Sequence, residues 1–320
     1  MNLVEYPIAQ SFGMPQAGQA TVAGFEPGHA FEDRVPAIDQ DYLFRLDPLA
    51  DLIGWWGMII NGMHTDGLFL YGDPAAGKTS LVTQMCARLN IPLISITGDE
   101  DRDIAELISS REIVDGDTQV HDGLITLAMR MGAVLLINEV SYFRPQTIVS
   151  LNDLIETRQV TIPETGEVVV AAPSFGVVVT DNTNGSADES GRFVGTKGQN
   201  EAFLDRFVFV QIDPMSPAEE TALLAARFPD QDATLLEKMV EVASQVRSAC
   251  KEGALTQAMS LRALTRWARW LSLKAVRAGD QAIYAAADRA FAWRLSPGQR
   301  EAFDAFVNTV FGIRRKSTGG

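Results

Sequence analysis

The sequence predicts an α/β fold in which a central parallel sheet of five strands is followed by a second, all-helical domain. Two observations support this prediction. Between residues 67 and 213, short β-branched apolar runs alternate with helical patterns, which is typical of a parallel sheet covered on both faces. After Asp213 the chain is rich in Ala, Leu and Arg and has a helical pattern as far as Phe311.

The five expected strands are the apolar runs of this alternating region. They cover residues 67–72, 92–98, 133–138, 175–182 and 207–213. Helices are expected at residues 46–66, 78–90, 103–110, 123–132 and 146–158. Within residues 78–90, Leu81, Met85 and Leu89 recur every four residues and form one apolar helix face.

Two hairpins are expected to interrupt the alternation. The segment 111–122 breaks a helical pattern and contains Asp115-Gly116, a turn sequence favoured in two-residue hairpin loops. Residues 159–171 form two β-branched runs around a turn at Glu164–Gly166. Both hairpins are insertions into the alternating α/β pattern.

Changes in composition predict the domain boundaries. Residues 1–45 are rich in Gly, Pro and acidic side chains, which indicates an extended arm in which residues 36–44 dock. Ser216 and Glu219 form a predicted capping box, with Pro217 at the first helical position. The α/β domain is therefore expected at 46–213, the helical domain at 214–312 and a disordered tail at 313–320.

The composition argues against several classes of protein. A net charge of −14 does not suit a protein that coats DNA or RNA. No apolar run approaches the ~20 residues of a membrane span, and the first residues lack the pattern of a secretory signal. Cys86 and Cys250 lie in apolar helical patterns, as expected for buried thiols in a reducing compartment. We therefore expect a cytoplasmic protein.

The strongest functional signal is a complete P-loop between the first expected strand and the following helix. Glycines at both ends of such a loop let successive N–H groups turn inward, and the helix start adds its own free N–H groups. Lys78 is expected to reach the β- and γ-phosphates and Thr79 to offer its hydroxyl to Mg²⁺. The expected ATP-binding residues are Gly72, Asp73, Pro74, Ala75, Ala76, Gly77, Lys78, Thr79 and Ser80.

Two polar residues, Asn138 and Glu139, end the third expected strand in the run LLINEV. Ligands of open α/β sheets bind at the carboxyl ends of strands, so these side chains should lie near the P-loop. Glu139 can orient the attacking water or accept its proton. A nucleotide-hydrolysing enzyme normally has Asp where this chain has Asn138. The amide keeps an oxygen but lacks the charge, so we expect hydrolysis with weaker Mg²⁺ binding.

Three further polar residues have a functional and a structural interpretation each. Asn182, after the fourth strand, could bind the γ-phosphate or the water, or simply close an Asx turn. Arg206, before the fifth strand, could reach the nucleotide of a neighbouring subunit as an arginine finger, or pair locally with Asp205 or a helix C-terminus. Arg262 could reach the γ-phosphate from the helical domain, or belong to a solvated basic face.

These residues, in this order along the chain, resemble the AAA+ ATPases. The broken helix at 111–122 resembles the helix-2 insert, and the hairpin at 159–171 resembles the pre-sensor-1 hairpin; together they are typical of the MoxR branch. Within that branch the chain is most similar to CobS-type subunits of aerobic cobaltochelatase. This similarity is carried by FGM at 12–14 and by the stretches 36–44, 182–207, 258–268 and 290–312.

The resemblance implies a role for each position. Gly72, Gly77, Lys78 and Thr79 match the Walker A motif, and Asn138 and Glu139 occupy the Walker B pair. Asn182 matches sensor 1, Arg206 the arginine finger and Arg262 sensor 2. The family also implies a six-membered ring, a partner with a von Willebrand A-type fold, and ATP-driven remodelling of a client protein.

Several functions remain open on the sequence alone. The chain could be a chelatase subunit, or a MoxR-like chaperone that activates another metalloenzyme. It could also be a nucleotide-gated interaction ring with little hydrolysis, because Asn138 replaces the Walker B carboxylate. A DNA motor is the least favoured alternative, since the chain is acidic and has no recognisable DNA-binding module.

Overall fold

The computed structural model describes residues 2–64, 66–114, 117–149, 151–186, 196–273 and 279–316. The chain divides into two compact units, one comprising Met1–Asp73 with Gly77–Asp213 and the other Pro74–Ala76 with Pro214–Gly320. The main division therefore falls between Asp213 and Pro214, where the sequence pattern changes from alternating to all-helical. No helix among the described residues is long and apolar enough to cross a membrane.

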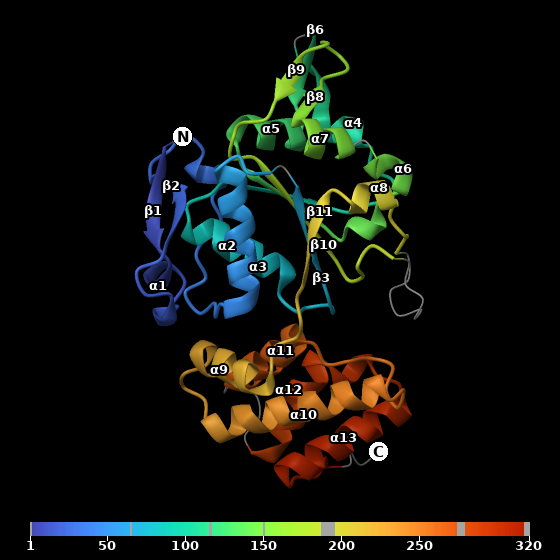
Figure 1. The fold of residues 1–320 in the computed structure, drawn as a ribbon. Helices are drawn as coiled ribbons and strands as arrows, with labels where there is room; N and C mark the ends of the chain where they lie inside the picture. The colour runs from blue at the N-terminus through green and yellow to red at the C-terminus, as the bar shows by residue number, and fades with distance from the viewer. Residues whose placement is uncertain are drawn as a thin grey trace. The chain divides into compact units, whose positions relative to one another are not determined.

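The first unit contains the predicted parallel sheet (Figure 1). Its strands lie in the order β11-β3-β10-β7-β4, and every neighbouring pair is parallel. Their bounds are β3 (Gly67–Tyr71), β4 (Leu93–Thr97), β7 (Val134–Asn138), β10 (Gly176–Asp181) and β11 (Phe207–Gln211). The central strands are apolar on both faces because helices cover both, which confirms the predicted α/β fold.

Two sets of helices bury the two faces of this sheet. One face packs with the helices that follow β4 and β7 in a single apolar cluster that includes Ile96, Leu135 and Val179. On the other face Gly176 lies directly against Trp55, so a side chain there would clash with the indole. The helices are α2 (Leu46–Ile60), α3 (Lys78–Arg88), α4 (Ile104–Ile108), α5 (Leu124–Met131), α6 (Pro145–Ile148), α7 (Leu151–Thr157) and α8 (Glu201–Leu204).

The N-terminal segment is folded rather than extended, so the predicted arm at 1–45 is wrong. Strands β1 (Leu3–Pro7) and β2 (Thr21–Phe25) form an antiparallel hairpin enclosing α1 (Ile8–Ser11) and η1 (Pro15–Ala17); η2 (Glu32–Arg34) follows. Phe12, Met14 and Phe25 are buried, and the Trp56 indole donates to the Ala23 carbonyl at 2.8 Å. A few apolar residues are enough to hold the N-terminal hairpin in place, because α2 and α3 supply the surface against which they pack.

The segment 36–44 docks on α3, as expected. The Asp39 N–H donates to Gln84 Oε1 at 2.8 Å, and Gln84 Nε2 donates to the Ala37 carbonyl at 3.1 Å. Arg88 Nη2 donates to the Asp39 carbonyl at 2.9 Å. Two side chains of the helix that follows the P-loop therefore hold this segment through its backbone.

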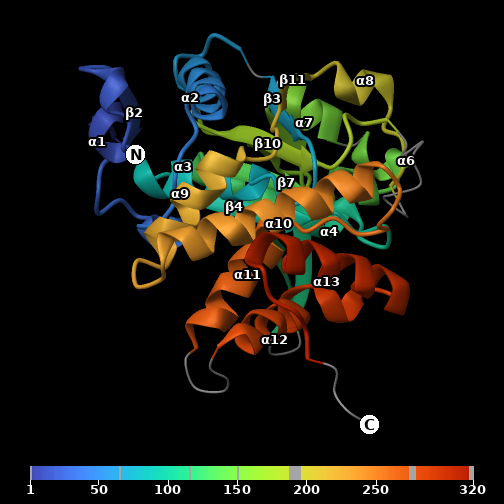
Figure 2. The same ribbon diagram turned by 90° about the horizontal axis from the view of Figure 1, so that it is seen from below.

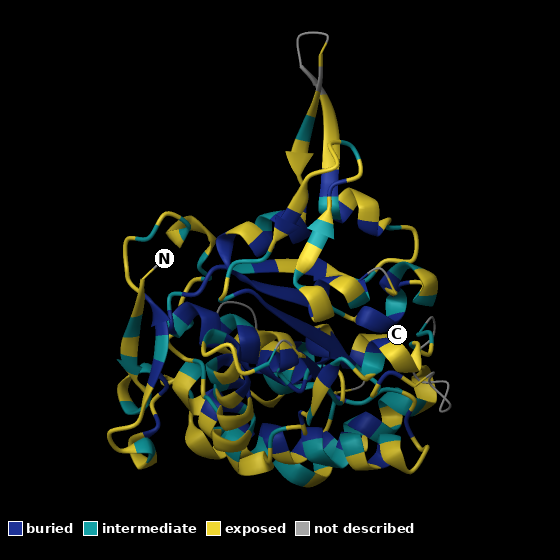
Figure 3. Ribbon diagram, turned by 45° about the horizontal axis from the view of Figure 1, so that its top comes forward, coloured by how far each residue is buried: buried dark blue, intermediate teal, exposed yellow. Residues whose placement is uncertain are grey.

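Both predicted hairpins are present: β5 (Ser109–Val114) with β6 (Asp117–Asp122), and β8 (Gln159–Thr161) with β9 (Val168–Val170). The turn at Asp115-Gly116 lies outside the described residues. The described side chains of β5 and β6 are mostly exposed (Figure 3). Both hairpins begin and end beside helices of the core, so they are additions to the sheet fold.

Charged side chains join the bases of the two hairpins. Glu164, in the loop after β8, accepts a hydrogen bond from Ser109 Oγ at 2.5 Å and forms an ion pair with Arg111 Nε at 3.3 Å. Arg130 of α5 contacts Asp122 at 2.9 Å and Glu167 at 2.7 Å. The pKa of Glu164 is lowered, mainly by the Ser109 hydrogen bond. The loop of one hairpin is therefore fixed to the start of the other.

The second unit is a helical bundle (Figure 2). It consists of α9 (Pro217–Arg227), α10 (Ala233–Lys251), α11 (Leu261–Ser272), α12 (Asp280–Ala290), η4 (Ala292–Arg294) and α13 (Pro297–Phe311). The predicted capping box is formed, with Ser216 N donating to Glu219 Oε2 at 2.7 Å. Trp267, Phe291 and Phe303 lie in its core.

Two ionic groups are built into this bundle. The Arg247 guanidinium donates to both oxygens of buried Glu220, at 2.9 and 2.6 Å. Arg315 contacts Asp288 at 2.8 Å and Asp304 at 2.6 Å. Residues 313–316, which we expected to belong to a disordered tail, are therefore held against α12 and α13. Residues 317–320 lie outside the described part of the chain.

Candidate functional site

The P-loop needs its two glycines for different reasons. Gly72 directly follows β3 and has φ +142°, and a Cβ there would lie 2.2 Å from the Ile212 carbonyl oxygen. Gly77 has φ +99° and is the N-cap of α3, so it turns the chain into the helix through a left-handed conformation. Ala75 also has a positive φ, of 63°. The sequence folds here into a tight loop whose N–H groups and helix start suit phosphate oxygens.

Lys78 places its ammonium group inside this loop. Nζ donates to the carbonyl oxygens of Gly72 at 2.7 Å and Asp73 at 3.1 Å, and to Asn182 Oδ1 at 3.1 Å. The side chain is 8% exposed, and burial lowers the pKa of Lys78, while the nearby carboxylates of Asp181, Asp73 and Glu139 oppose that shift. A cation so placed fits the negative charge of a bound polyphosphate.

Thr79 and Asn138 meet as predicted, although they are far apart in sequence. Thr79 Oγ1 donates to Asn138 Oδ1 at 2.7 Å, and Asn138 Nδ2 donates to Ser95 Oγ at 2.8 Å. Thr180 Oγ1 also donates to Asn138 Oδ1, at 3.3 Å. Two neutral oxygens face each other beside the P-loop, and oxygen is the ligand atom that Mg²⁺ prefers. Thr79 and Asn138 therefore fit a magnesium ion that takes most of its ligands from phosphates and water.

No group of three or more His, Cys, Asp or Glu side chains within the described ranges could hold a metal by itself. The donor set beside Thr79 thus suits a metal that arrives with a nucleotide, rather than a resident metal centre held by carboxylates or imidazoles.

Glu139 lies next to this pair in a left-handed backbone conformation, with φ +53°. Its side chain is exposed, and its N–H donates to Thr180 Oγ1 at 3.4 Å. Gly98 packs so closely that a Cβ there would lie 2.1 Å from the Glu139 carbonyl oxygen. Unfavourable conformations of this kind persist where the surroundings enforce them, often at functional sites. The geometry leaves the Glu139 carboxylate available to a water molecule.

Asp181 is a residue of this site that the sequence analysis did not single out. It is 0% exposed, and its carboxylate accepts from Ser141 Oγ at 2.6 Å and from Thr183 Oγ1 at 2.6 Å. Ser141 lies two residues after Glu139, and Thr183 directly follows Asn182. The acidic residue at the end of an otherwise apolar strand was the available signal. Asp181 fixes the two polar turns that carry Glu139 and Asn182.

Arg206 lies at the amino ends of the parallel strands, whereas the P-loop lies at their carboxyl ends. Its carbonyl accepts from the N–H of Gly67, the first residue of β3, whereas the P-loop follows the last residue of that strand. Its guanidinium contacts Glu156 at 2.5 Å and the carbonyl of Ala202 in α8. The local partner is thus Glu156 rather than Asp205, together with a helix carbonyl. Arg206 cannot serve the P-loop of its own chain without crossing the sheet.

Arg262 lies in the helical unit, in the first turn of α11. Ser260 caps this helix by accepting from the Ala263 N–H at 3.3 Å. Arg262, Arg266 and Arg269 are all exposed, as a solvated basic face requires. A role of Arg262 at the nucleotide stays a prediction. Of the stretch 182–207 that carries the family resemblance, residues 187–195 lie outside the described chain.

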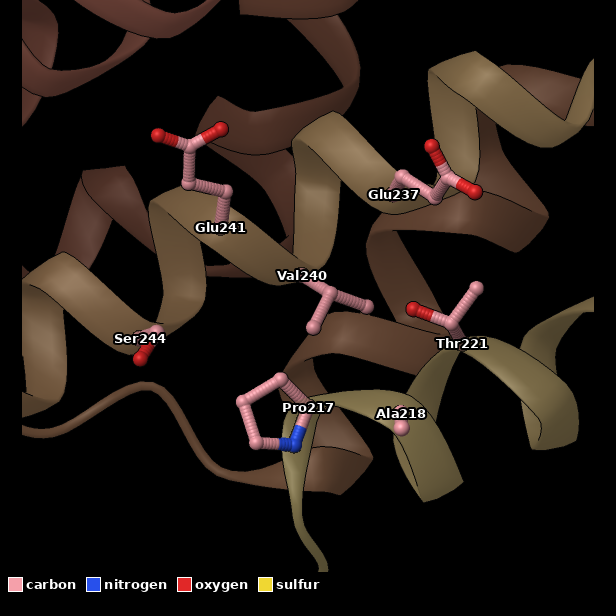
Figure 4. Close-up of a pocket in the computed structure, with 7 residues that line it drawn as sticks. All are labelled: Pro217, Ala218, Thr221, Glu237, Val240, Glu241 and Ser244. Atoms are coloured by element: carbon pink, nitrogen blue, oxygen red, sulfur yellow. The ribbon is translucent and has the colours of Figure 1, made fainter.

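A shallow groove in the helical unit is a weaker candidate for ligand binding (Figure 4). It lies between α9 and α10 and has Glu237 and Glu241 along one side. Two carboxylates would repel phosphate groups, so the groove does not compete with the P-loop for a nucleotide. Its lining residues are Pro217, Ala218, Thr221, Glu237, Val240, Glu241 and Ser244.

Comparison with known proteins agrees with this geometry. The family model of the AAA domain, dynein-related subfamily, matches residues 67–207. An uncharacterised protein of Staphylococcus haemolyticus is 31% identical over 204 residues, which are 62% of this chain and 74% of that protein. The aerobic cobaltochelatase subunit CobS of a Sinorhizobium species is 29% identical over 258 residues, or 77% of this chain and 75% of that protein.

A similar protein of Staphylococcus epidermidis, also uncharacterised, is 29% identical over 204 residues, again 62% of this chain and 74% of its own length. The matched family region begins at the first residue of β3 and ends at the first residue of β11. It therefore contains the P-loop, both insertion hairpins, Asn138, Glu139, Asn182 and Arg206.

Proposed function

This chain belongs to the AAA+ ATPases of the MoxR/CobS type, and on that basis we propose that it binds ATP with Mg²⁺ and hydrolyses it. The observation that carries the proposal is the meeting of Lys78, Thr79, Asn138 and Asn182 at the carboxyl edge of one parallel sheet. Chemically different side chains from three separate strand ends converge there, as a phosphate site requires.

In the proposed reaction, the P-loop residues 72–80 hold the phosphates and the Lys78 ammonium offsets their charge. Thr79 and Asn138 hold Mg²⁺, in part through water, and the bound ion would draw charge from the phosphate oxygens. Asn182 orients the γ-phosphate or the attacking water. Glu139 accepts the proton of that water as it attacks. Arg262 contributes from the helical unit as sensor 2.

We further propose that the site is completed by a neighbouring copy of the chain. Arg206 lies at the amino ends of the strands, and its own P-loop lies at their carboxyl ends. It can therefore stabilise the γ-phosphate of a bound nucleotide only in another subunit. The position of Arg206 supports assembly into a ring, and we propose six subunits by analogy with the family. We propose that it acts in the cytoplasm on a client, with a von Willebrand A-type partner, as a chelatase motor or a metalloenzyme-activating chaperone.

Mixing two inactive variants tests this arrangement. Lys78→Ala should lose ATP binding, and Arg206→Ala should bind ATP without turning it over. Mixed rings should hydrolyse ATP, because a Lys78→Ala subunit still offers Arg206 to the intact P-loop of an Arg206→Ala neighbour. Arg34→Ala, which removes an exposed arginine paired with Asp33, is the control and should keep full activity.

A mixture that stays inactive would remove the proposal of a shared site. Undiminished hydrolysis by Arg206→Ala alone would do the same. The Glu156 contact of Arg206 is largely exposed on the glutamate side, so its loss should cost less than about 1 kcal/mol of stability. Loss of turnover in a folded Arg206→Ala protein can therefore be assigned to the missing guanidinium.

A second candidate function is supported by Asn138 itself. With an amide in place of the Walker B carboxylate, the protein could bind nucleotide and change its interactions while hydrolysing little. A steady-state ATPase assay with Mg²⁺ titration separates this interaction ring from a motor. Negligible turnover at saturating Mg²⁺ would favour the interaction ring, and the proteins that co-purify with the chain would identify its client in either case.

A further inference from the structure

We infer that Ser95 is the positioning residue for Asn138: it accepts a hydrogen bond from the Asn138 amide group and so directs the amide oxygen toward Thr79. The inference rests on the proposed function, because it takes the oxygens of Thr79 and Asn138 to face the Mg²⁺ of a bound nucleotide. It adds a residue on the edge strand β4 that belongs to no part of the P-loop or Walker B motifs.

The amide creates a problem that a carboxylate does not have. An ionised Asp presents two acceptor oxygens, whichever way it turns. Asn presents one oxygen and one NH₂ group, and only the oxygen can face a cation or accept a hydrogen bond from its bound water. A half-turn of the Asn138 amide would point its NH₂ group, instead of its oxygen, at Thr79. The orientation of this one amide therefore decides whether the site attracts Mg²⁺ or repels it.

Three hydrogen bonds agree on one orientation. Asn138 Nδ2 donates to Ser95 Oγ at 2.8 Å, and Thr79 Oγ1 donates to Asn138 Oδ1 at 2.7 Å. On the same side, Thr180 Oγ1 accepts the backbone N–H of Glu139 and donates to Asn138 Oδ1. A backbone N–H can only donate, so it directs the hydrogen of the Thr180 hydroxyl toward an acceptor, which is the amide oxygen.

The position of Ser95 makes it a suitable test residue. Its neighbours Ile94 and Ile96 point into the core, while Ser95 lies on the other side of β4 and is exposed. Strand β4 is the edge strand beside β7, and Thr97 is the register partner of Asn138. Removing an exposed hydroxyl from an edge strand should leave the stability of the fold almost unchanged. The hydroxyl can therefore be deleted without unfolding the sheet.

The experiment is a double-mutant cycle in the full chain, using the wild type, Ser95→Ala, Asn138→Asp and the double variant. Binding of a fluorescent ATP analogue is titrated with Mg²⁺ in each. Ser95→Ala should raise the Mg²⁺ concentration for half-maximal binding about tenfold, a common effect of losing a group that orients a metal ligand. In the Asn138→Asp background the same change should be much smaller, because a carboxylate has no wrong orientation. Ser95→Thr should restore the wild-type value.

The outcomes separate this inference from the proposed function. An equal shift in both backgrounds, or no shift in either, would overturn the role of Ser95. Absence of any Mg²⁺-dependent nucleotide binding in the wild type and in Asn138→Asp would overturn the proposed function and the inference with it. A shift confined to the Asn138 background supports the inference even in a protein that hydrolyses no ATP, because the readout is binding.

Discussion

The ammonium group of Lys78 donates a hydrogen bond to the amide oxygen of Asn182, at 3.1 Å. This bond joins the P-loop helix to the residue that follows β10, and the two residues are 104 positions apart in the sequence. Asn182 therefore does not simply close the strand, because its amide contacts the Lys78 ammonium group, which should bind the γ-phosphate. The functional interpretation of Asn182 thus has a contact in its support.

Replacement of Lys78 by Ala should abolish measurable ATP binding, since the loop would lose the only cation that donates into it from α3. Titration with a fluorescent ATP analogue measures the effect. Lys251→Ala is the matched control, because Lys251 is exposed at the end of α10 and should leave the affinity unchanged. Similar affinities of the two variants would place the nucleotide elsewhere.

Replacement of Asn138 by Asp should lower the Mg²⁺ concentration needed for half-maximal ATPase activity. The carboxylate adds a negative charge where the amide oxygen now accepts from Thr79, and metal affinity rises with the charge of the ligands. A Mg²⁺ titration of steady-state hydrolysis checks the prediction. An unchanged Mg²⁺ dependence would mean that Asn138 does not lie near the ion.

Replacement of Asp181 by Ala should slow turnover while leaving ATP binding nearly intact. The change leaves the Ser141 and Thr183 hydroxyls without their common acceptor, so the turns that carry Glu139 and Asn182 lose their connection. A loss of about 1–3 kcal/mol in stability is expected from these unsatisfied groups. Turnover number and nucleotide affinity, measured together with thermal unfolding, separate the two effects.

Asp181→Asn provides the control for this prediction. Its amide can accept from Thr183 through the oxygen and donate to Ser141, whose hydroxyl can accept as well as donate. Most of the wild-type turnover should therefore remain. A fully active Asp181→Ala variant would show that the two turns hold their places without the carboxylate.

Replacement of Glu220 by Ala should destabilise the helical unit by about 3 kcal/mol, because it leaves the Arg247 guanidinium without the carboxylate that it binds through two hydrogen bonds. Glu237→Ala removes an exposed carboxylate from α10 and should change stability by less than about 0.5 kcal/mol. Chemical denaturation of both variants measures the difference. Equal stabilities would mean that Arg247 finds water or another acceptor at no cost.

The sequence predicted the parts of the site that lie on local patterns. The P-loop spacing identifies Gly72 to Thr79 as one short phosphate-binding motif. The strand pattern places Asn138 and Asn182 at the carboxyl ends of the sheet strands. Ser95 and Glu156 escaped detection because nothing in their neighbourhoods marks them. Their roles depend on which strand lies beside β7 and which helix lies beside α8, and such contacts arise only in the folded chain.

The N-terminal segment shows a different limit. Its high content of Gly and Pro suggested an extended arm, but Phe12, Met14 and Phe25 are buried. Composition averages over the segment, whereas packing depends on a few apolar side chains at the right spacing. At the other end of the chain, the basic and polar composition suggested a disordered tail. The sequence did not indicate that Arg315 binds two carboxylates, which lie on separate helices.

The contacts of Glu164 and Arg130 give the two insertion hairpins a shared mechanical base. Glu164, in the loop of the β8–β9 hairpin, contacts Ser109 and Arg111 at the start of the β5–β6 hairpin. Arg130 of α5 contacts Asp122 at the end of β6 and Glu167 next to β9. Displacing one hairpin relative to the other or to α5 therefore requires these contacts to break. Because α5 is followed by β7 and Asn138, one helix connects both hairpins to the strand that precedes Glu139.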